Sequence, residues 1–338
     1  MKKIVHLVNT GNYSGLENVV MNICKLDKNN EHIYVSPRGK INNILKKNNV
    51  RHIDVQKISC RKISKIIKQE KPDIIHAHDV TASVIAAVLS FRFKKRIISH
   101  LHSNDPLMNV FSKRWLLYTL SIPRFEKIFI VSESVKDEYK GNFLKNSITL
   151  GNVVFFSGIE QVTTEKLYDV IMVGRLEPQK DPIKFLSIIT HVKKEIPSIK
   201  AAYVGEGSMY EEFHKNINSM GLKSNINYLG FQENPYQFMK KSRVFVLTSL
   251  YEGFGLVALE AMLLGLPAVV SNVGGLPTIV DNKSGLISSN IDYQVTEIIK
   301  LLKSDSYYRN KSKHAQAKAI KLNDIDKFLS KLQTVYGN

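Results

Sequence analysis

The sequence lacks several features that would assign the protein to well-known structural classes. It has two cysteines in 338 residues, Cys24 and Cys60, too few for a disulfide framework or a cysteine-rich metal site. No apolar run approaches the ~18 residues of a transmembrane helix, and the longest, ASVIAAVLSF, predicts a buried helix. The first segment, MKKIVHLVNTGNYSG, turns polar too early for a signal peptide. These absences predict a cytoplasmic protein.

Three further motifs are missing, and each absence argues against a class of protein. No G-x-G-x-x-G follows the first predicted strand, which argues against a dinucleotide-dependent oxidoreductase. The sequence contains neither a repeat at a solenoid period nor a low-complexity tract. It also lacks the basic–aromatic motifs typical of nucleic-acid-binding proteins, so we expect no nucleic acid as a partner. A non-enzymatic, nucleic-acid-binding protein remains an alternative that rests on charge alone.

Positive charge is what the sequence has in excess. The net charge is +18, of which residues 1–165 contribute +12, with 26 basic and 14 acidic residues, and residues 166–338 contribute +6. A basic first half favours an anionic partner, such as a phosphorylated substrate, anionic lipid or nucleic acid. A composition rich in lysine and asparagine would produce the same excess without such a partner.

Short β-branched runs alternate with helical patterns along almost the whole chain, which is typical of parallel α/β sheets. The stretch 151–167 interrupts this alternation with Gly, Ser and Thr and predicts a linker. We therefore expect an α/β protein with two doubly wound, Rossmann-like domains, whose ligands bind beyond the carboxyl ends of the strands. The predicted boundaries are 1–155 and 166–315 for the two domains and 316–338 for a C-terminal helical tail. Strands are predicted at 3–9, 32–37, 52–57, 73–79, 96–103, 127–134, 168–174, 200–207, 226–231, 243–249 and 267–274.

Two glutamates stand in the otherwise uncharged run LTSLYEGFGLVALEAMLLGLPAVVSNVGG, residues 247–275. The run predicts a buried strand, a glycine-bearing turn with Glu252 at the end of the strand, and a helix that contains Glu260. The amides of Phe254, Gly255 and Leu256 lie at the N-terminus of this helix, which is a binding site for anions. A favourable helix-dipole charge explains Glu252 without any ligand, but a carboxylate at Glu260 on so apolar a helix requires a partner.

A second anion-binding element is predicted in VGRLEPQKDP, residues 173–182. The strand ends at Gly174, and Asp181-Pro182 is typical of a helix cap followed by the first helical position. Arg175 and Lys180 then lie on a loop at the same edge of the sheet as Glu252. A guanidinium and an ammonium beside a helix N-terminus suit a diphosphate. Each cation taken alone would more commonly be a solvated loop residue.

The second half resembles the nucleotide-sugar site of the family-4 glycosyltransferases of the GT-B fold. The motifs that carry this resemblance are GRLEPQKD, VGEGSMYEEF, YLGF and SLYEGFGLVALEAMLLGLPAVVSNVGGLPTIVDNKSG. The first half resembles the family through GNYSGLENVV, IIHAHD and SHLHSND, with Ser14 where a glycine is usual. Thr278 also stands where many members have glutamate. The resemblance implies two domains that face a central cleft, with the C-terminal helix returning to the first domain.

The same resemblance implies a role for residues in each motif. As catalytic residues it implies Glu252, which contacts the sugar hydroxyls near the reacting centre, and His102, at the position of the active-site histidine. Glu260 is implied to bind the ribose, and Ser14 and Gly15 to lie in the acceptor loop. The full set of donor-binding residues that we expect is Arg175, Lys180, Gly205, Glu206, Phe254, Gly255, Leu256 and Glu260. No cofactor is implied, since the nucleotide-diphosphate sugar is a substrate.

Two patterns could instead indicate metal. His76-x-His78 and His100-x-His102 each place two imidazoles on one face of a strand, with Asp79 and Asp105 nearby. No single cluster offers three ligands at a familiar spacing, so polar residues at a ligand-binding edge explain them better and no metal is expected. The run Asp324 to Asp326 resembles the metal-binding Asp-x-Asp of the other glycosyltransferase fold, but it opens the last predicted helix and is better explained as a charged helix start.

The basic first half offers two candidate membrane surfaces. SCRKISKIIKQEK is better explained as an ordinary amphipathic helix. FSKRWLLYTLSIPRFEK places the only tryptophan, Trp115, beside Lys113 and Arg114 in an aliphatic helix, a mixture that suits an anionic membrane surface. We therefore expect a cytoplasmic protein that associates peripherally with the inner face of the cell membrane through these three residues.

The function predicted from these observations is a retaining, metal-independent hexosyltransferase. It would move a hexosyl unit from a nucleotide-diphosphate sugar to a glycan or lipid-linked acceptor in surface polysaccharide synthesis. An alternative enzyme class is a GT-B epimerase, which acts on the same nucleotide sugar without an acceptor. No motif identifies the base of the nucleotide, the sugar or the acceptor.

Overall fold

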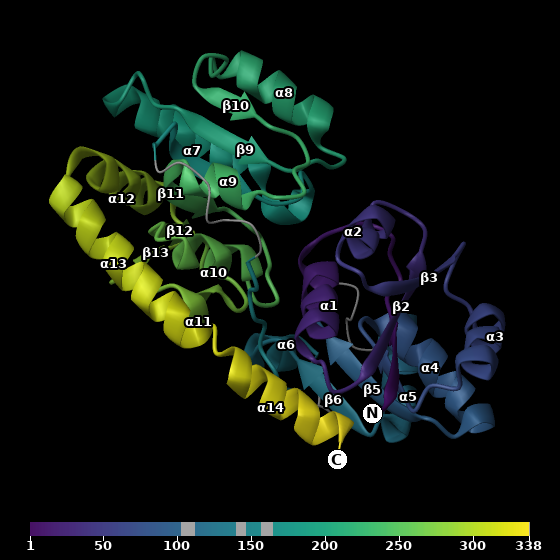
Figure 1. The fold of residues 1–338 in the computed structure, drawn as a ribbon. Coiled ribbons are helices and arrows are strands. Elements are labelled where there is room, and N and C mark those ends of the chain that lie inside the picture. Colours follow the sequence, from purple (N-terminus) through teal and green to yellow (C-terminus); the bar gives the residue numbers. More distant parts are fainter. Residues whose placement is uncertain (103–111, 140–146, 157–164, 338) are drawn as a thin grey trace. The chain divides into compact units, whose positions relative to one another are not determined.

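The chain folds into two compact α/β units, each built on one parallel sheet (Figure 1). A computed structural model describes residues 1–102, 112–139, 147–156 and 165–337. The first unit comprises Met1–Val153 together with Ile325–Asn338, and the second comprises Val154–Asp324. The sequence boundary predicted at 316 is therefore wrong, because a single helix, α13 (Asp305–Leu322), continues through it within the second unit.

The sheet of the first unit has the order β3-β2-β1-β4-β5-β6-β7 among the described residues, with every pair parallel. This order, which reverses beside β1, is that of a doubly wound fold and confirms the predicted fold class. The strands are β1 (Lys3–Leu7), β2 (Glu31–Pro37), β3 (Arg51–Val55), β4 (Ile74–Ala77), β5 (Arg96–Leu101), β6 (Lys127–Ile130) and β7 (Ile148–Thr149).

Alternation along the strands of the first unit separates an apolar face from a polar one. Val5 and Leu7 of β1 pack with Ile63 and Ile67 of α3 and with α4 in one apolar core. His6, between them, points to the opposite face and is also fully buried. The helices are α1 (Gly15–Leu26), α2 (Ile41–Lys47), α3 (Cys60–Glu70), α4 (Val80–Phe93), α5 (Lys113–Ser121), η1 (Ile122–Arg124), α6 (Glu133–Glu138) and α14 (Ile325–Tyr336).

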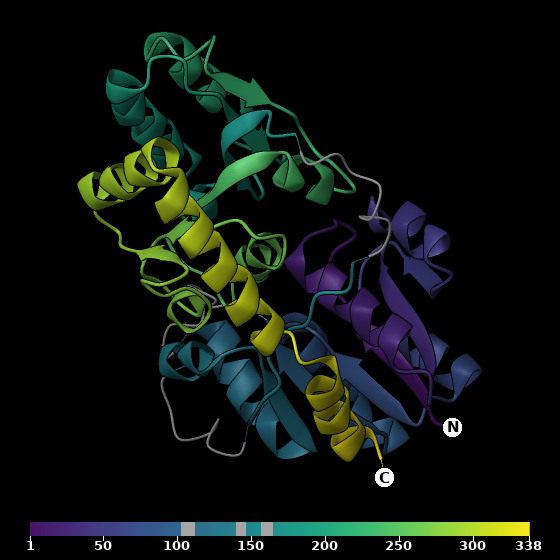
Figure 2. The same ribbon diagram turned by 60° about the vertical axis from the view of Figure 1, so that its left-hand side comes forward.

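Helix α14 returns to the first unit, as predicted (Figure 2). Its C-terminal carbonyls accept hydrogen bonds from Arg96, at 2.7 Å to Val335 O and 2.9 Å to Tyr336 O. Cations at the carboxyl end of a helix also offset its dipole. The helix begins at Ile325, so Asp324 and Asp326 lie at its start, where a charged helix start was expected.

The second unit repeats the architecture with the strand order β10-β9-β8-β11-β12-β13 within the part of the chain that the structure describes. Its strands are β8 (Tyr168–Val173), β9 (Ala201–Val204), β10 (Ile226–Tyr228), β11 (Ser242–Leu247), β12 (Ala268–Val270) and β13 (Gly285–Ile287). Its helices are η3 (Pro178–Lys180), α7 (Pro182–Glu195), α8 (Tyr210–Ser219), α9 (Tyr236–Lys240), α10 (Leu256–Leu263), α11 (Leu276–Ile279), α12 (Ile291–Lys303) and α13.

All eleven predicted strands are present, and two short strands at the sheet edges, β7 and β13, were missed. The expected linker, 151–167, falls at the junction of the two units, although residues 157–164 lie outside the described part. Among the described residues, no helix is both long and apolar enough to span a bilayer.

The fold generates a prediction at Gly205, which follows β9. Its φ is +144°, and a Cβ there would lie 1.8 Å from the carbonyl oxygen of Gly174, at the end of the adjacent strand β8. Gly205→Ala should therefore lower the free energy of unfolding by more than about 3 kcal/mol, because both backbones would have to move. Gly221 is the matched control, since its φ is +65° but a Cβ would meet nothing within 4 Å.

In urea unfolding, Gly221→Ala should cost about 1 kcal/mol, the strain of a left-handed backbone alone. Equal losses in the two variants would mean that the contact between Gly205 and Gly174 does not constrain the strand ends.

Candidate functional site

Four neighbouring strands of the second unit end at one edge of the sheet, in the spatial order β9-β8-β11-β12. Each is followed by one of the motifs singled out in the sequence: GEGSM after β9, GRLEPQK after β8, SLYEGFG after β11 and SNVGG after β12. Because the carboxyl ends of parallel strands meet at the same edge, residues distant in sequence are brought together there.

Lys180 and Glu252 form an ion pair across this edge, between the loops that follow β8 and β11. Their side chains are 12% and 9% exposed, and Ser249 Oγ donates a second hydrogen bond to Glu252 Oε1 at 2.9 Å. A glutamate that merely favoured a helix dipole would lie open to solvent, so burial and pairing argue against that simpler explanation. Removing either partner would leave an uncompensated buried charge.

Backbone contacts hold the two loops in this position. Thr248 Oγ1 lies 2.9 Å from Lys180 O and 2.8 Å from Asp181 O, and Leu250 N donates to Gln179 O at 2.8 Å. Asp181 caps α7 through a hydrogen bond from Lys184 N at 3.1 Å, as the Asp-Pro sequence predicted. The ammonium of Lys180 is thereby fixed beside Glu252.

Arg175 lies in the same loop but is exposed, and its guanidinium donates to Gln179 Oε1 at 2.6 Å. The carboxylate of Glu177 accepts from Ser208 N and Ser208 Oγ, at 2.9 and 2.6 Å, and these bonds hold its pKa below the usual range. The loops after β8 and β9 are thus joined, which places exposed Glu206 beside the loop of Arg175.

Three glycines allow the backbone of SNVGG to press against the loop of Glu252 and the start of α10. A Cβ at Gly274, whose φ is +53°, would lie 1.6 Å from Glu252 O, and one at Gly275 would lie 2.6 Å from Gly253 O. Gly255 is the N-cap of α10 with φ +92°, and its Cβ would meet the side chain of Leu276. Helix α10 therefore begins at Leu256 with Phe254 and Gly255 preceding it, as expected for the anion site.

Glu260 is buried inside α10, with 5% of its surface exposed. Tyr236 OH donates a hydrogen bond to Glu260 Oε1 at 3.0 Å, and the ring of Tyr236 packs edge-on against Phe156, with 4.8 Å between centroids. Burial raises the pKa of Glu260 to about 7, an effect that the Tyr236 hydrogen bond only partly offsets. The side chain can therefore change its protonation state near neutral pH.

The remaining predicted site residues lie in the first unit. Ser14 precedes α1, where its backbone N–H and its hydroxyl donate to Glu17 Oε2 at 2.8 and 2.6 Å. Gly15 is exposed, and a Cβ there would meet nothing within 4 Å. His102 follows β5, and burial lowers its pKa to about 3, so the ring is neutral at physiological pH.

His102 belongs to a cluster of six histidines that the sequence analysis identified only in part. The cluster comprises His6, His32, His76, His78, His100 and His102. Sequence spacing offered no group of three possible metal ligands, but the structure does. Their ligand atoms lie within 4.8 Å of one another in the groups His6/His76/His78, His78/His100/His102 and His6/Cys24/His32. Asp105, expected nearby, lies outside the described residues.

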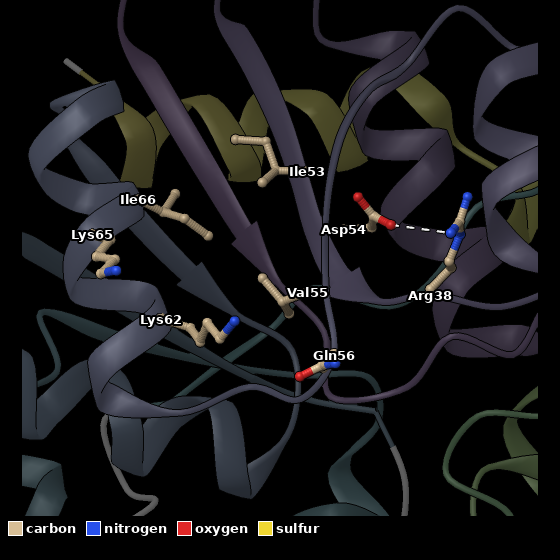
Figure 3. A pocket seen from close by; sticks show the side chains of 8 residues that line it. All are labelled: Arg38, Ile53, Asp54, Val55, Gln56, Lys62, Lys65 and Ile66. Atoms are coloured by element: carbon tan, nitrogen blue, oxygen red, sulfur yellow. Dashed lines mark ion pairs between the residues drawn. The ribbon is translucent and has the colours of Figure 1, made fainter.

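The two basic helices of the first unit differ in character. In α3, Ile63, Ile66 and Ile67 are buried while Lys62 and Lys65 are exposed, which is the ordinary amphipathic helix predicted. Lys62 and Lys65 line an open hollow beside β3, where Arg38 pairs with Asp54 at 3.6 Å (Figure 3). In α5, by contrast, the exposed residues are largely aliphatic, with Leu116, Leu117 and Leu120 at 50%, 53% and 68%.

Several residues of the site were missed by the sequence analysis. Ser249 and Gln179 sit within recognised motifs but contribute through contacts that depend on the loop conformation. Tyr236 lies outside every motif, and no local pattern connects it to Glu260. His6 could have been found, because it is a lone polar residue within the apolar run of β1, which is buried from Ile4 to Leu7.

The raised pKa of Glu260 predicts a pH dependence of stability. The folded protein keeps this proton up to about pH 7, whereas the unfolded chain loses it near 4.5, so the stabilisation is complete below 4.5 and is lost as pH rises to 7. We expect the free energy of unfolding to fall by about 3 kcal/mol more over this range than in Glu260→Gln, which has no carboxyl to ionise.

The measurement is urea unfolding between pH 4.5 and 8, with Glu211→Gln, an exposed glutamate of α8, as control. The explanation fails if the Glu260→Gln and Glu211→Gln proteins follow the same pH dependence as the parent.

Two family descriptions match the chain, one on each unit. Glycosyltransferase Family 4 matches residues 14–149, and Glycosyl transferases group 1 matches residues 159–321. Together they cover the acceptor-loop motif from Ser14 onward, the strands β4 and β5 with their histidines, and all four motifs at the edge of the second sheet.

Similar proteins agree with this assignment. An uncharacterized glycosyltransferase of Methanocaldococcus jannaschii is 28% identical over 258 residues, 69% of this chain and 63% of that protein. The UDP-Gal:alpha-D-GlcNAc-diphosphoundecaprenol alpha-1,3-galactosyltransferase of Escherichia coli is 27% identical over 233 residues, 62% of this chain and 60% of that one. The matched segments thus span about three-fifths of the length of these relatives.

The fold is also similar to that of a solved structure. The crystal structure of HepE from Anabaena, in complex with UDP and glucose, superimposes with a TM-score of 0.86 at 20% identity and covers 98% of both chains. With the two parallel sheets, the strand order and the motifs at the sheet edge already described, these matches show that the chain belongs to the family-4 glycosyltransferases of the GT-B fold.

Proposed function

We propose that this protein is a retaining, metal-independent hexosyltransferase that uses a nucleotide-diphosphate sugar as donor. The observation that carries the proposal is the buried Lys180–Glu252 pair beside Arg175 and the N-terminus of α10. This edge combines positive charge for a diphosphate with a carboxylate that can accept hydrogen bonds from sugar hydroxyls. The second unit is then the donor-binding domain and the first unit the acceptor-binding domain.

The ammonium of Lys180 can bind Glu252 and a phosphate at the same time. An ammonium has three N–H donors, and the pair with Glu252 engages one of them. The others are available for phosphate oxygens, joined by the guanidinium of Arg175 and by amides at Phe254, Gly255 and Leu256. When the bond between the sugar and the phosphate breaks, negative charge grows on the leaving diphosphate, and fixed cations with helix amides stabilise it. This arrangement supplies that stabilisation without a metal ion.

Glu252 and Glu260 have different roles in this proposal. Glu252, which is paired with Lys180 and accepts a hydrogen bond from Ser249, accepts further hydrogen bonds from hydroxyls of the transferred sugar. Glu260, with a pKa of about 7, accepts from the ribose diol. Gly205 and Glu206 line the donor site from the loop after β9. His102, Ser14 and Gly15 act on the sugar and the acceptor from the first unit.

The acceptor is proposed to be a lipid-linked or glycan intermediate of surface polysaccharide synthesis. The E. coli relative is named for transfer to a diphosphoundecaprenol-linked sugar, and another relative, CapH of Staphylococcus aureus, for capsular polysaccharide biosynthesis. An acceptor of this type carries its own diphosphate, which suits the basic first half of the chain.

The experiment that tests the function combines donor binding with turnover. UDP, GDP and dTDP sugars are first compared by thermal shift, because saturation at ~100 times the dissociation constant stabilises by ~2.7 kcal/mol. The stabilising donor is then incubated with polyprenyl-diphosphate-linked sugar acceptors, with chelator present. Acceptor-dependent transfer with an unchanged anomeric configuration supports the proposal. Release of nucleotide and an epimerised sugar without acceptor would indicate an epimerase, and inhibition by chelator would contradict metal independence.

Within this assay we predict a specific defect for Lys180→Ala. The dissociation constant for the nucleoside diphosphate should rise tenfold to about a hundredfold, because a charge-assisted contact to phosphate is lost, while the nucleoside should bind as before. Lys193→Ala is the control, since Lys193 lies on α7 and its ammonium donates to Gly221 O at 2.7 Å. Equal losses for nucleotide and nucleoside would assign Lys180 a structural role.

We further propose that the first unit associates with an anionic membrane through α4 and α5. These helices pack together and carry five exposed apolar residues, with exposed fractions of 50–68%: Val88, Phe91, Leu116, Leu117 and Leu120. Lys113 and Arg114 precede Leu116 on α5, the first exposed and the second partly buried, and the guanidinium of Arg124 lies 3.7 Å from the centroid of the Phe91 ring. Trp115, which was expected to contact the membrane, is only partly exposed, so we assign the main membrane contact to the leucines.

Replacing Leu116, Leu117 and Leu120 together by serine should reduce binding to phosphatidylglycerol vesicles more than tenfold, because three half-exposed leucines lose apolar burial in the bilayer. Donor affinity should not change. Tyr293, Ile320 and Leu322 changed to serine serve as the control, since they are exposed at 40–66% in the other unit. Co-sedimentation measures the effect, and a parent that binds neutral vesicles equally well would contradict the anionic preference.

A further inference from the structure

The six-histidine cluster occupies the polar face of the first sheet, where it contacts Tyr336 of α14 and lies close to Cys24 of α1. Its members come from β2, β1, β4 and β5, which are adjacent in the sheet, and from the residues that follow β4 and β5. His6, His76, His78 and His100 are 0% exposed. Such burial is unusual for imidazoles and favours ring nitrogens that have partners. Among the described residues, His76 Nε2 and both ring nitrogens of His100 have no hydrogen-bond partner.

Four of the histidines form one continuous hydrogen-bonded chain. His32 Nδ1 lies 2.9 Å from His6 Nε2, His6 Nδ1 lies 2.9 Å from His78 Nε2, and His78 Nδ1 lies 3.0 Å from His102 Nε2. At the far end, His32 Nε2 lies 3.2 Å from Asp27 Oδ2 and 3.1 Å from Asp27 O. The chain therefore runs from Asp27, at the end of α1, to His102, which follows β5.

Asp27 sets the direction of every bond in this chain. Both of its contacts to His32 are through oxygens, and hydrogen bonds from His32 and Asn30 outweigh burial and hold the pKa of its carboxyl below the usual range. The carboxylate only accepts, so His32 Nε2 carries a proton, and in the neutral ring His32 Nδ1 is then an acceptor. A neutral imidazole has one donor and one acceptor, so each following ring donates through the nitrogen nearer Asp27.

The rings of His6, His78 and His102 are neutral, as this counting requires. Burial, followed by repulsion from neighbouring imidazoles, lowers the pKa of His6 and His78 well below the ordinary value, and burial lowers that of His102 to about 3. The tautomer of His102, at the end of the hydrogen-bonded chain, follows from this. His102 donates through Nε2 to His78, and its Nδ1 is an unprotonated nitrogen, buried and without a hydrogen-bond partner among the described residues.

A metal explains these contacts less well. Of the three groups with close ligand atoms, two consist of histidines alone, His6/His76/His78 and His78/His100/His102. Each group includes His78, whose two nitrogens are already engaged at 2.9 and 3.0 Å by His6 and His102. An ion in either group would take a nitrogen of His78 out of the chain and leave a ring nitrogen on its neighbour unpaired.

We propose that Asp27, His32, His6 and His78 are positioning residues that hold His102 as its Nε2–H tautomer, so that His102 offers Nδ1 only as a hydrogen-bond acceptor. The proposal rests on the proposed function for its consequence, which is that a hydroxyl of the bound sugar must donate to His102. His102 then orients that hydroxyl and does not protonate it. The class of ligand that fits is a polyol, which always has a proton to donate.

The tautomer can be measured directly on the whole protein. Selective 15N labelling of histidine and long-range proton–nitrogen correlation distinguish protonated from bare ring nitrogens, and His102→Gln identifies the His102 signals. We expect a bare Nδ1 and a protonated Nε2 at pH 7 in the parent protein. A protonated Nδ1 would overturn the proposal.

His6→Phe and His76→Phe form a matched pair of variants. The two residues face each other in the register of β1 and β4 and are equally buried, but only His6 is in the chain. In His6→Phe the Nε2–H of His78 has no acceptor, so His78 should turn to donating through Nδ1 and His102 should become Nδ1–H. In His76→Phe the tautomer should not change.

The His6→Phe and His76→Phe variants also distinguish a positioning role of His6 from a role in stability alone. If both variants lose similar thermal stability, kcat/KM for sugar transfer should fall about tenfold further in His6→Phe, the worth of one misdirected hydrogen bond. His32→Phe, one link farther from His102, should shift the tautomer in the same direction. Equal tautomers and equal activities across the three variants would overturn the proposal, as would one equivalent of zinc retained by the dialysed parent protein.

The outcomes also separate this proposal from the function on which it rests. The tautomer is read without substrate, so an Nε2–H tautomer in a protein that transfers no sugar would refute the proposed function alone. Sugar transfer by a protein with an Nδ1–H tautomer would refute the positioning role alone.

Discussion

The close approach of backbones at the carboxyl edge of the second sheet is the constraint on which the site depends. Gly205 touches the carbonyl of Gly174, and Gly274 touches that of Glu252, at distances that admit no side chain. Parallel strands already direct their loops to one edge, but the glycines let these loops contact each other directly. Lys180 and Glu252, 72 residues apart, are therefore held as an ion pair in a loop region where single charges would be solvated.

The two units offset the energetic cost of burying polar groups in different ways. In the second unit, opposite charges meet directly in the pair Lys180–Glu252, while Glu260 is buried and accepts a hydrogen bond from the hydroxyl of Tyr236, with a pKa that burial raises to about 7. In the first unit, four histidine rings bond to one another as donors and acceptors with one carboxylate at the end, while both ring nitrogens of buried His100 have no hydrogen-bond partner among the described residues. The first arrangement suits a charged ligand, and the second suits a neutral hydroxyl.

Local patterns predicted those parts of the molecule that local physics determines. Buried strands, the Asp-Pro cap at Asp181 and the strand–turn–helix around Glu252 follow from neighbouring residues, and all are present. The short edge strands β7 and β13 have two or three residues and too little pattern to detect. The link from His6 to His78 depends on which strands become neighbours in the sheet, and so the sequence indicated two histidine pairs but not the chain. The boundary at 316 failed because α13 continues without an interruption.

Helix α14 shows why the first unit needs residues from the other end of the chain. Tyr336 OH lies 2.7 Å from His76 Nδ1, and the carbonyls at the end of the helix are bound by Arg96, which is itself paired with Glu126. The polar face of the sheet would otherwise meet water at its strand histidines, and neutral rings in water lose the burial that keeps them neutral. The returning helix thus provides both a partner for His76 and the low-dielectric surroundings in which a chain of uncharged imidazoles has one direction.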